Sequence, residues 1–373
     1  METQNPLQIQ ELIDLCITFL CGPRSWQDLL SCALVARSWV APAQASLFHT
    51  PHVTNHRFMK IDRLALLFCE TITAYPFLAS YVRELNIVEY FYLQRAAIGK
   101  ICSTTFPRLE CLSINLSRIS IWEGELSSLV TLKTLRYLQL DANEGFPVIS
   151  SFVSRFTPTI EHLDLRCRQW DGILVDTSVP PIKITSLRLE VQLWNAPPQR
   201  LDIGLLYPFE ISQLRALEVV DAGSLVWDSI PDRTRQTIKI LQLDLKSEPI
   251  DLSRFPHLIL LRVVLPEDDV SVLVRTLKTI TSEHCLETLI IWTGFCEPAP
   301  EECKELDITL SSLPLDPFPK IQMESSVIRP RREQDLRDMF PKLVSQNKFI
   351  MSHFRRWNIE DGIRKVGRRF MYT

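Results

Sequence analysis

The chain is poor in glycine, which supplies only ten of its 373 residues. None of these glycines forms a GxGxxG, GxxxxGKS or GxxxxGKT pattern, so the sequence does not predict a loop that cradles nucleotide phosphates. The GxSxG and HExxH patterns are missing as well, so neither a serine hydrolase nor a zinc protease is indicated. With no catalytic residues assembled by any motif, we expect a protein that is not an enzyme and that uses no cofactor.

The chain also lacks a charge excess and a long apolar run. Its formal net charge is −3, whereas a protein that binds nucleic acid along its whole length needs a clear basic excess. No apolar run approaches the roughly 18 residues that a membrane span needs, and the first residues lack the basic and apolar regions of a secretory signal. We therefore expect a protein of the cytoplasm, the nucleus or both, without a membrane span.

The ten cysteines form no CxxC pair and no regular framework. Free thiols in a reducing compartment explain them better than disulfides or a zinc site. His49, His52 and His56 have a spacing that could bind a metal, but no cysteine or carboxylate nearby completes a ligand set. We interpret these histidines as polar residues at the exit of a helical segment, and we expect no metal site.

The strongest pattern in the sequence is a repeat of Leu-x-x-Leu-x-Leu, with Ile or Val at some of its positions. Its second position is leucine in nine copies, namely Leu85, Leu112, Leu138, Leu163, Leu187, Leu217, Leu241, Leu261 and Leu289. The intervals of 20 to 30 residues are close to the roughly 20–29 residues of a leucine-rich repeat. The last two apolar residues of each copy lie two apart, so both point to the same face of a short strand.

Each of these strands needs a return segment, and two segments have helical spacing. Helices are predicted over residues 147–156, between Pro147 and Pro158, and over residues 270–277. The asparagine that often follows the template is clear only at Asn143. The sequence therefore predicts an α/β fold, an irregular leucine-rich-repeat solenoid with parallel strands and helical return segments.

The first 80 residues have helical patterns instead. Helices are predicted over residues 6–20 and 28–36, the second running on to Trp39, and Pro42 is expected to break the chain before a short helix over 42–48. A further helix is predicted over residues 60–80. The apolar stripe of residues 28–48 is too large for so short a stretch to bury alone, so it needs the rest of the chain or a partner.

This N-terminal stretch resembles an F-box of the kind found in fungal F-box-like proteins. Residues 29–39 read Leu-Leu-Ser-Cys-Ala-Leu-Val-Ala-Arg-Ser-Trp and resemble its second half, and the preceding residues 5–20 resemble its first half, with Asn5 and Gln8 differing from the usual residues. The resemblance implies docking on the Skp adaptor of an SCF ubiquitin ligase, and through it on a cullin. The docking residues that it implies are Pro6, Ile9, Ile13, Leu29, Leu34, Val35 and Trp39. The alternative is that some of them, Ile13 and Trp39 above all, only hold the module's own helices together.

The residues after Trp292 have weaker patterns. We expect a loop over 294–306, strands over 307–315, 320–325 and 347–352, and a helix over 331–339. From Arg329 onward the chain contains twelve Lys and Arg residues and five Asp and Glu residues, which gives this end a net charge of +7. We interpret this end as a cap over the last repeat, with binding to an anionic surface, nucleic acid or membrane, as the alternative.

These patterns divide the chain into a helical F-box-like module (1–50), a helical linker (51–80), the repeat solenoid (81–328) and a basic cap or tail (329–373). The resemblance implies a substrate-recognition adaptor that docks the ligase through the module and holds an unknown client protein on the repeats. A repeat scaffold without ligase docking is the competing interpretation. The client is expected at the outward positions of the strands, namely Tyr137, Asp141, Asp164, Arg166, Arg188, Glu190, Glu218, Asp244, Arg262 and Trp292.

Overall fold

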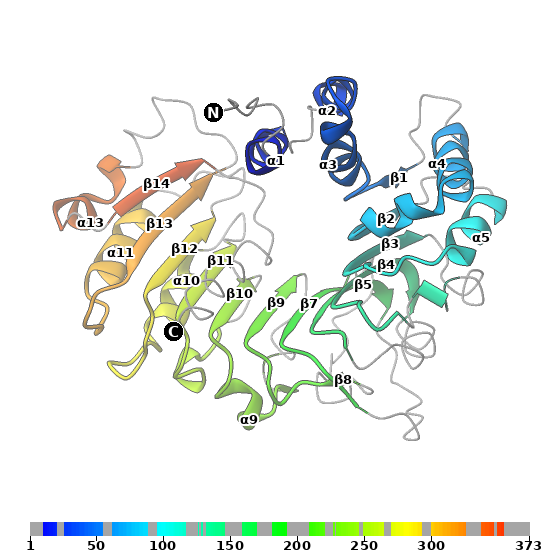
Figure 1. The fold of residues 1–373 in the computed structure, drawn as a ribbon. Helices are drawn as coiled ribbons and strands as arrows, with labels where there is room; N and C mark the ends of the chain where they lie inside the picture. Colours follow the sequence, from blue (N-terminus) through cyan, green and yellow to red (C-terminus); the bar gives the residue numbers. More distant parts are fainter. Residues whose placement is uncertain are drawn as a thin grey trace. The chain divides into compact units, whose positions relative to one another are not determined.

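The structure is a computed structural model. It describes residues 10–20, 26–54, 62–88, 95–116, 126, 128–129, 132–145, 159–169, 181–191, 209–220, 227, 229–245, 249–264, 270–292, 300–325, 337–346 and 349–353. The chain forms two compact units, Met1–Ile160 and Glu161–Thr373, and each has its own run of parallel strands (Figure 1). The mixed α/β fold class with parallel strands that the sequence predicts is thereby confirmed.

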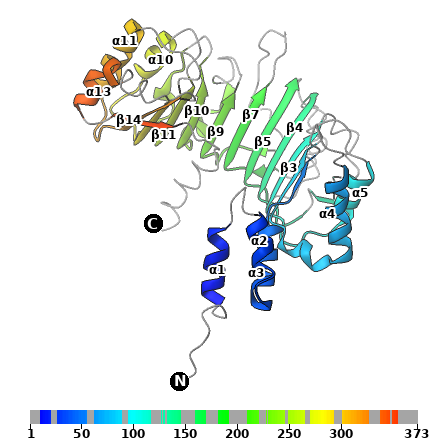
Figure 2. The same ribbon diagram turned by 90° about the horizontal axis from the view of Figure 1, so that it is seen from above.

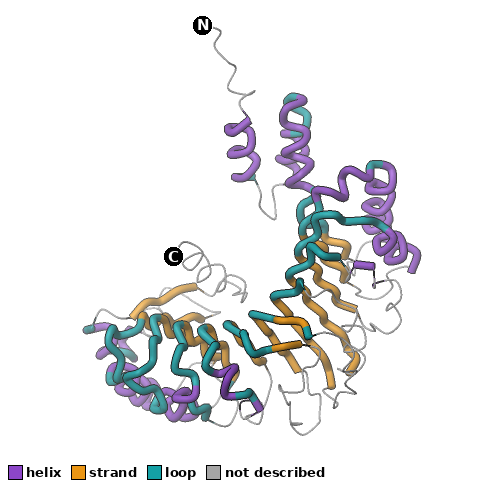
Figure 3. The backbone as a smooth tube through the Cα atoms, turned by 60° about the horizontal axis from the view of Figure 1, so that its bottom comes forward, coloured by secondary structure: helices purple, strands orange, loops and turns teal. Residues whose placement is uncertain are grey.

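The first unit begins with three helices. They are α1 (Gln10–Phe19), α2 (Trp26–Cys32) and α3 (Arg37–Leu47). Helix α3 packs against both α1 and α2, so the three form one helical module. Next come α4 (Asp62–Ala74) and the 3₁₀ helix η2 (Pro76–Tyr81), and α4 packs against α5 (Arg95–Ser103). Figure 3 shows these helices in purple, and the strands of the same unit in orange.

The strands of the first unit follow one another in sequence order. They are β1 (His52–Thr54), β2 (Glu84–Val88), β3 (Cys111–Leu116) and β4 (Tyr137–Gly145). Each pairs in parallel with the next, and the register places Leu85 beside Leu112 and Leu112 beside Leu138. All three leucines are fully buried, so the first three copies of the repeat occupy equivalent positions in one core.

The second unit continues the same pattern over more strands. Its sheet has the order β5 (His162–Gln169), β7 (Ser186–Val191), β9 (Ala216–Val220), β10 (Ile240–Asp244), β11 (Leu260–Val264), β12 (Thr288–Trp292), β13 (Lys320–Ser325) and β14 (Phe349–His353). A small second sheet pairs β6 (Ile182–Lys183) with β8 (Phe209–Glu210). The remaining six template leucines stand in direct register and are buried. Ile321 on β13 extends the row by one position beyond Leu289.

Short helices return the chain between these strands. They are α9 (Asp232–Arg235), η4 (Leu252–Arg254), α10 (Val270–Leu277), α11 (Pro300–Ser311) and α13 (Pro341–Ser345). Helices α10, α11 and α13 pack in succession and lie together on one side of the strands (Figure 2). The predicted helix over 270–277 is confirmed as α10, and the predicted strands over 320–325 and 347–352 are confirmed as β13 and β14.

The structure corrects two predictions about helices. Helix α3 continues through Pro42, because packing of Trp39 and Ala43 on either side of the proline outweighs the lost backbone hydrogen bond. Residues 307–311 belong to α11 and not to a strand, and this helix also takes the last residues of the predicted loop. Its buried side chains Cys303, Leu306 and Leu310 have helical spacing. The alternation of polar and apolar residues from Asp307 onward also fits a strand, which is why a strand was predicted.

Two further boundaries differ from the prediction. The segment 60–80 divides at Tyr75 into α4 and η2, since Pro76 begins a new turn. Helix α2 ends at Cys32, and α3 starts at Arg37 after a turn. The predicted helix over 147–156 lies outside the described residues, and so does most of the one over 331–339.

Candidate functional site

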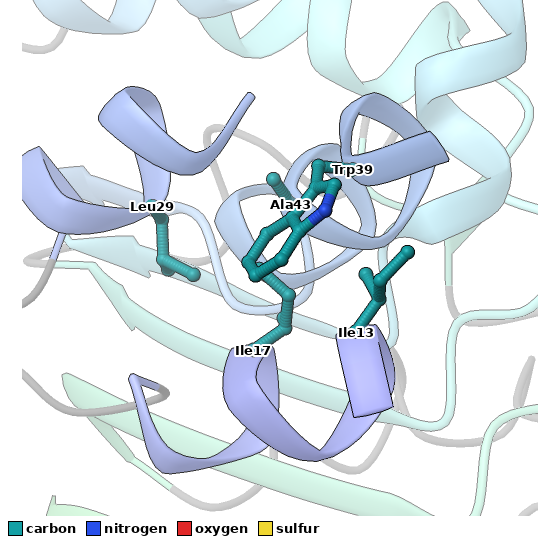
Figure 4. Packing of buried hydrophobic residues seen from close by; sticks show 5 residues of the cluster. All are labelled: Ile13, Ile17, Leu29, Trp39 and Ala43. Atoms are coloured by element: carbon teal, nitrogen blue, oxygen red, sulfur yellow. The ribbon is translucent and has the colours of Figure 1, made fainter. Parts of the chain in front are cut away.

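The helical module has a small apolar core of its own. Five buried side chains form it, namely Ile13 and Ile17 from α1, Leu29 from α2, and Trp39 and Ala43 from α3 (Figure 4). The indole of Trp39 points from α3 toward the two isoleucines of α1 (Figure 4). Ile13 and Ile17 lie four residues apart, so helical geometry puts both on the face of α1 that meets α3.

The same module leaves other large apolar side chains exposed. They are Leu12, Leu15 and Phe19 on α1, Leu30 on α2, and Leu34 and Val35 in the turn between α2 and α3. Leu34 is 87% exposed and Phe19 is 82% exposed. Leu12, Leu15 and Phe19 have the spacing i, i+3, i+7, so α1 has a second apolar stripe beside the one that it buries. Exposed apolar surface concentrated in so small a module is typical of a protein-binding site.

The structure divides the seven predicted docking residues. Ile13, Leu29 and Trp39 belong to the module's core. Leu34 and Val35 are exposed and available to a partner. Pro6 and Ile9 lie outside the described residues.

Four exposed apolar residues of the module were not among the predicted docking residues, namely Leu12, Leu15, Phe19 and Leu30. A signal for the first three was present, because residues 12–19 have two interleaved helical stripes and only one of them can face α3. Nothing in the sequence pattern alone says which stripe is buried.

The second candidate surface is the strand face of the second unit, by which we mean the side of its sheet opposite the buried template leucines. Side chains at alternate strand positions share this face. The register aligns one row as Asp164, Arg188, Glu218, Gln242, Arg262, Ile290 and Gln322. Two residues further along the strands a second row contains Arg166, Glu190, Val220, Asp244, Val264, Trp292 and Glu324.

Charged side chains of the two rows form a network across neighbouring strands. At its first end Arg166 Nε lies 3.6 Å from Asp164 Oδ1 and 3.3 Å from Glu190 Oε2. Arg188 Nε lies between two carboxylates, 3.8 Å from Asp164 Oδ1 and 3.5 Å from Glu218 Oε1. The first row thus alternates in charge from β5 to β9, which is the favourable order for cross-strand neighbours.

The network continues through hydrogen bonds toward β13. Gln242 Nε2 donates to Glu218 Oε1 at 2.6 Å, and Gln242 Oε1 accepts from Arg262 Nη1 at 2.9 Å. Arg262 Nη2 in turn donates to Glu324 Oε2 at 3.1 Å. One connected polar network therefore extends from β5 to β13 over the strand face.

Burial shifts the pKa values of three members of this network. The pKa of the Asp164 carboxyl is raised because burial disfavours its charge, and Arg188 and Arg166 oppose this effect. Burial likewise raises the pKa of Glu218 from 4.5 to about 7, against the opposing charge of Arg188. Burial lowers the pKa of Arg262, while the neighbouring Glu324 favours its charged form. The cost of burial exceeds the help of the partners in each case.

The predicted client-binding residues fall into groups in the structure. Asp164, Glu218 and Arg262 are almost completely buried within the network, so a client would not meet them directly. The other residues of this set in the second unit are half-buried, namely Arg166, Arg188, Glu190, Asp244 and Trp292.

Tyr137 and Asp141 belong to β4 in the first unit and are half-buried. Asp141 Oδ2 accepts a hydrogen bond of 2.9 Å from Asn115 on β3. Gln242 and Glu324 belong to the network but were not among the predicted client-binding residues. The strand that carries Glu324 was predicted, but it was not counted among the nine copies of the pattern from which that set was drawn.

The described part of the chain contains no group of three or more His, Cys, Asp and Glu residues that could hold a metal ion. His52 lies in β1, and His56 lies outside the described residues. None of the described helices is both long enough and apolar enough to cross a membrane. No model of a known protein family matches this chain, and no curated protein matches it.

Proposed function

We propose that the chain is the substrate-recognition adaptor of an SCF-type ubiquitin ligase. In this proposal the helical module of α1, α2 and α3 is an F-box-like module that docks a Skp adaptor. The strands and helices after it form an irregular leucine-rich-repeat solenoid that holds a client protein. The register of the template leucines in parallel strands supports the repeat assignment, because stacked repeats bury a continuous core in this way.

The observation that carries the proposal is the exposure of Leu34 and Val35 beside a module core that is complete without them. Leu34 is 87% exposed and Val35 is 55% exposed. Burying a leucine or valine side chain in an interface contributes about 1.5–3 kcal/mol. These residues gain that stabilisation only when a partner covers them.

The mechanism in this proposal is positional and involves no bond chemistry by the chain itself. A client held on the repeats stays near the activated ubiquitin that the ligase brings, so the effective concentration of its lysines rises. The absence of catalytic motifs from the sequence agrees with such a role.

The test is co-expression of the full chain with a Skp adaptor, followed by affinity purification. We expect the adaptor to co-purify with the unaltered chain and to be lost with Leu34→Asp/Val35→Asp. Leu67→Asp is the matched control, because Leu67 is a half-exposed leucine of α4 outside the module. Failure of the adaptor to co-purify with the unaltered chain would refute the docking proposal.

A repeat scaffold without ligase docking is the second candidate function. The placement of Ile13, Leu29 and Trp39 in the module's core favours it, because three of the implied docking residues then have a purely structural role. Client proteins captured by a chain that binds no Skp adaptor would support this candidate.

A further inference from the structure

We propose that the junction between α4 and η2 is a binding site for a proline-rich segment of a partner protein, held as a polyproline II helix. The site consists of three aromatic side chains, Tyr75, Phe77 and Tyr81, which we call the aromatic row. The aromatic row lies outside the module of α1, α2 and α3, so the proposal is independent of docking on a ubiquitin ligase.

The three rings contact one another in sequence. The ring centroids of Tyr75 and Phe77 lie 6.4 Å apart with an interplanar angle of 73°, and those of Phe77 and Tyr81 lie 6.4 Å apart with an angle of 88°. Both pairs have the edge-to-face geometry that aromatic rings prefer. The row is at most about 13 Å long from the first centroid to the last, which is the length of roughly four residues of a polyproline II helix.

The aromatic row is anchored through its backbone and exposed at its rings. Leu78 and Ala79 of η2 are buried, and η2 packs against both α3 and α4. Tyr75 is 57% exposed and Phe77 is 55% exposed, whereas Tyr81 is half-buried. A single exposed aromatic residue is ordinary, but adjoining exposed rings form a continuous apolar surface of the kind that binds a partner.

The hydroxyl groups at the two ends of the row indicate the chemistry of the ligand. In the described part of the chain no residue is hydrogen-bonded to the hydroxyl of Tyr75 or Tyr81, and each hydroxyl can donate one hydrogen bond. A proline-rich segment is complementary, because a polyproline II helix has no internal hydrogen bonds and its carbonyl groups take donors from outside. The carbonyl groups of an α-helical ligand are bonded within the helix, so such a ligand would not use these donors in this way.

The short length of the row also favours a ligand that is ordered before it binds. Three rings offer little area with which to offset the conformational entropy that a flexible segment loses on binding. Proline has a fixed φ angle, so a proline-rich segment loses less of this entropy. Its flat apolar rings pack well on aromatic side chains, which is the usual way in which proline-rich segments are bound.

The charge next to the aromatic row predicts which residue flanks the prolines. Glu70 is the only charged residue from Leu67 to Val82. It is exposed on α4 one helical turn before Ala74, and Tyr75 follows Ala74 directly. We therefore expect an Arg or Lys beside the prolines of the ligand.

The test is a peptide array that is probed with the full chain. The array carries Pro-x-x-Pro peptides with varied x residues and with Arg, Glu or Ser at either flank, together with copies in which alanine replaces both prolines. We expect a subset of the Arg-flanked peptides to bind and their alanine copies not to bind. The peptide that binds most tightly is then labelled with a fluorophore, and its affinity is measured by fluorescence polarisation.

Phe77→Ser should weaken this affinity roughly tenfold or more, because it removes the central ring of the row. Ile308→Ser is the matched control, since Ile308 is a 45% exposed apolar residue of α11 outside the row, and it should leave the affinity unchanged. Circular dichroism of both variants verifies that they are folded.

Two further variants test the hydroxyls and the charge separately. Tyr75→Phe/Tyr81→Phe keeps all three rings and should weaken binding roughly tenfold, because two hydrogen bonds to the ligand are lost. Glu70→Lys should reverse the preference of the array, so that Glu-flanked peptides bind more tightly than Arg-flanked ones.

Three results would overturn the proposal. Binding of no Pro-x-x-Pro peptide on the array would show that the row does not take a proline-rich ligand. An affinity that Phe77→Ser leaves unchanged would place the peptide elsewhere on the chain. Dimerisation of the unaltered chain that Phe77→Ser abolishes, measured by analytical ultracentrifugation, would make the row an interface between two copies of the chain.

Discussion

Arg262 on β11 extends across β12 and donates a hydrogen bond of 3.1 Å to Glu324 on β13, two strands away. Both side chains are about 5% exposed. The register aligns Arg262 with Ile290 on β12, whereas Glu324 is aligned with Trp292, two residues further along that strand, so the contact is diagonal. Arg262 occupies a strand position on the side opposite the leucine core, yet its long side chain is buried and binds another buried network residue. The strand face is consequently less accessible than its row of charged residues suggests.

The first prediction concerns this ion pair. Arg262→Met removes the partner of a buried carboxylate, so we expect a loss of about 3–5 kcal/mol in the free energy of unfolding. Urea titration followed by tryptophan fluorescence measures the change. The double variant Arg262→Met/Glu324→Leu should recover most of the loss, because no unpaired charge is left buried. Equal stability of Arg262→Met and the unaltered chain would show that Glu324 tolerates the loss of this partner.

The second prediction concerns pH and Glu218. Burial raises the pKa of this carboxyl from 4.5 to about 7 in the folded chain. The folded chain therefore binds the proton more tightly than the unfolded chain does. The stability from this group is complete below about pH 4.5 and is lost as the pH rises through 7, by about 3 kcal/mol in all.

Glu218→Gln should remove this group's contribution and flatten the pH dependence of stability. Urea unfolding at about pH 5 and about pH 7.5 gives the comparison, with Glu283→Gln as the control at an exposed carboxylate. An equally large pH dependence in Glu218→Gln and in the unaltered chain would contradict the prediction.

The third prediction concerns the cysteines. Burial raises the pKa values of Cys69 and Cys303 to about 11, and both side chains are fully buried. At about pH 8 only roughly one in a thousand of these thiols is ionised, and alkylating reagents attack the thiolate. We expect iodoacetamide to label the exposed Cys16 and Cys285 in the folded chain and to label Cys69 and Cys303 only in urea. Labelling of all four at one rate under folding conditions would contradict this.

The repeat could be predicted because it depends on spacing alone. Apolar residues two apart, recurring at intervals of 20 to 30 residues, define both the strand and its buried face, and the structure places all nine copies in strands whose template leucine is buried. For the polar network on the strand face, the sequence predicts that charged residues lie there but does not predict which of them bind one another. That Arg262 reaches Glu324 follows from the register of β11, β12 and β13, which the sequence does not specify.

The helical segments show a different limit. Residues 300–311 contain apolar letters that fit both a strand and a helix, and only the burial of Cys303, Leu306 and Leu310 with exposure of Ile308 decides between them. The module of α1, α2 and α3 shows the same limit, because a stripe of apolar residues predicts a contact without indicating which side a partner would cover. Trp39 and Leu34 were both predicted as docking residues, but Trp39 is buried in the module's core and Leu34 is exposed.

That contrast gives the last prediction. Trp39→Ala removes the largest side chain of a five-residue core and should cost about 3–5 kcal/mol, enough to unfold a module of three short helices. Leu34→Ala alters a side chain that is 87% exposed and should change stability by less than about 0.5 kcal/mol. Hydrogen exchange of the amides in α1 and α3 measures both effects: protection should collapse in Trp39→Ala and persist in Leu34→Ala. Loss of protection in Leu34→Ala would mean that Leu34 stabilises the module itself, and its exposure would then no longer indicate a partner's binding site.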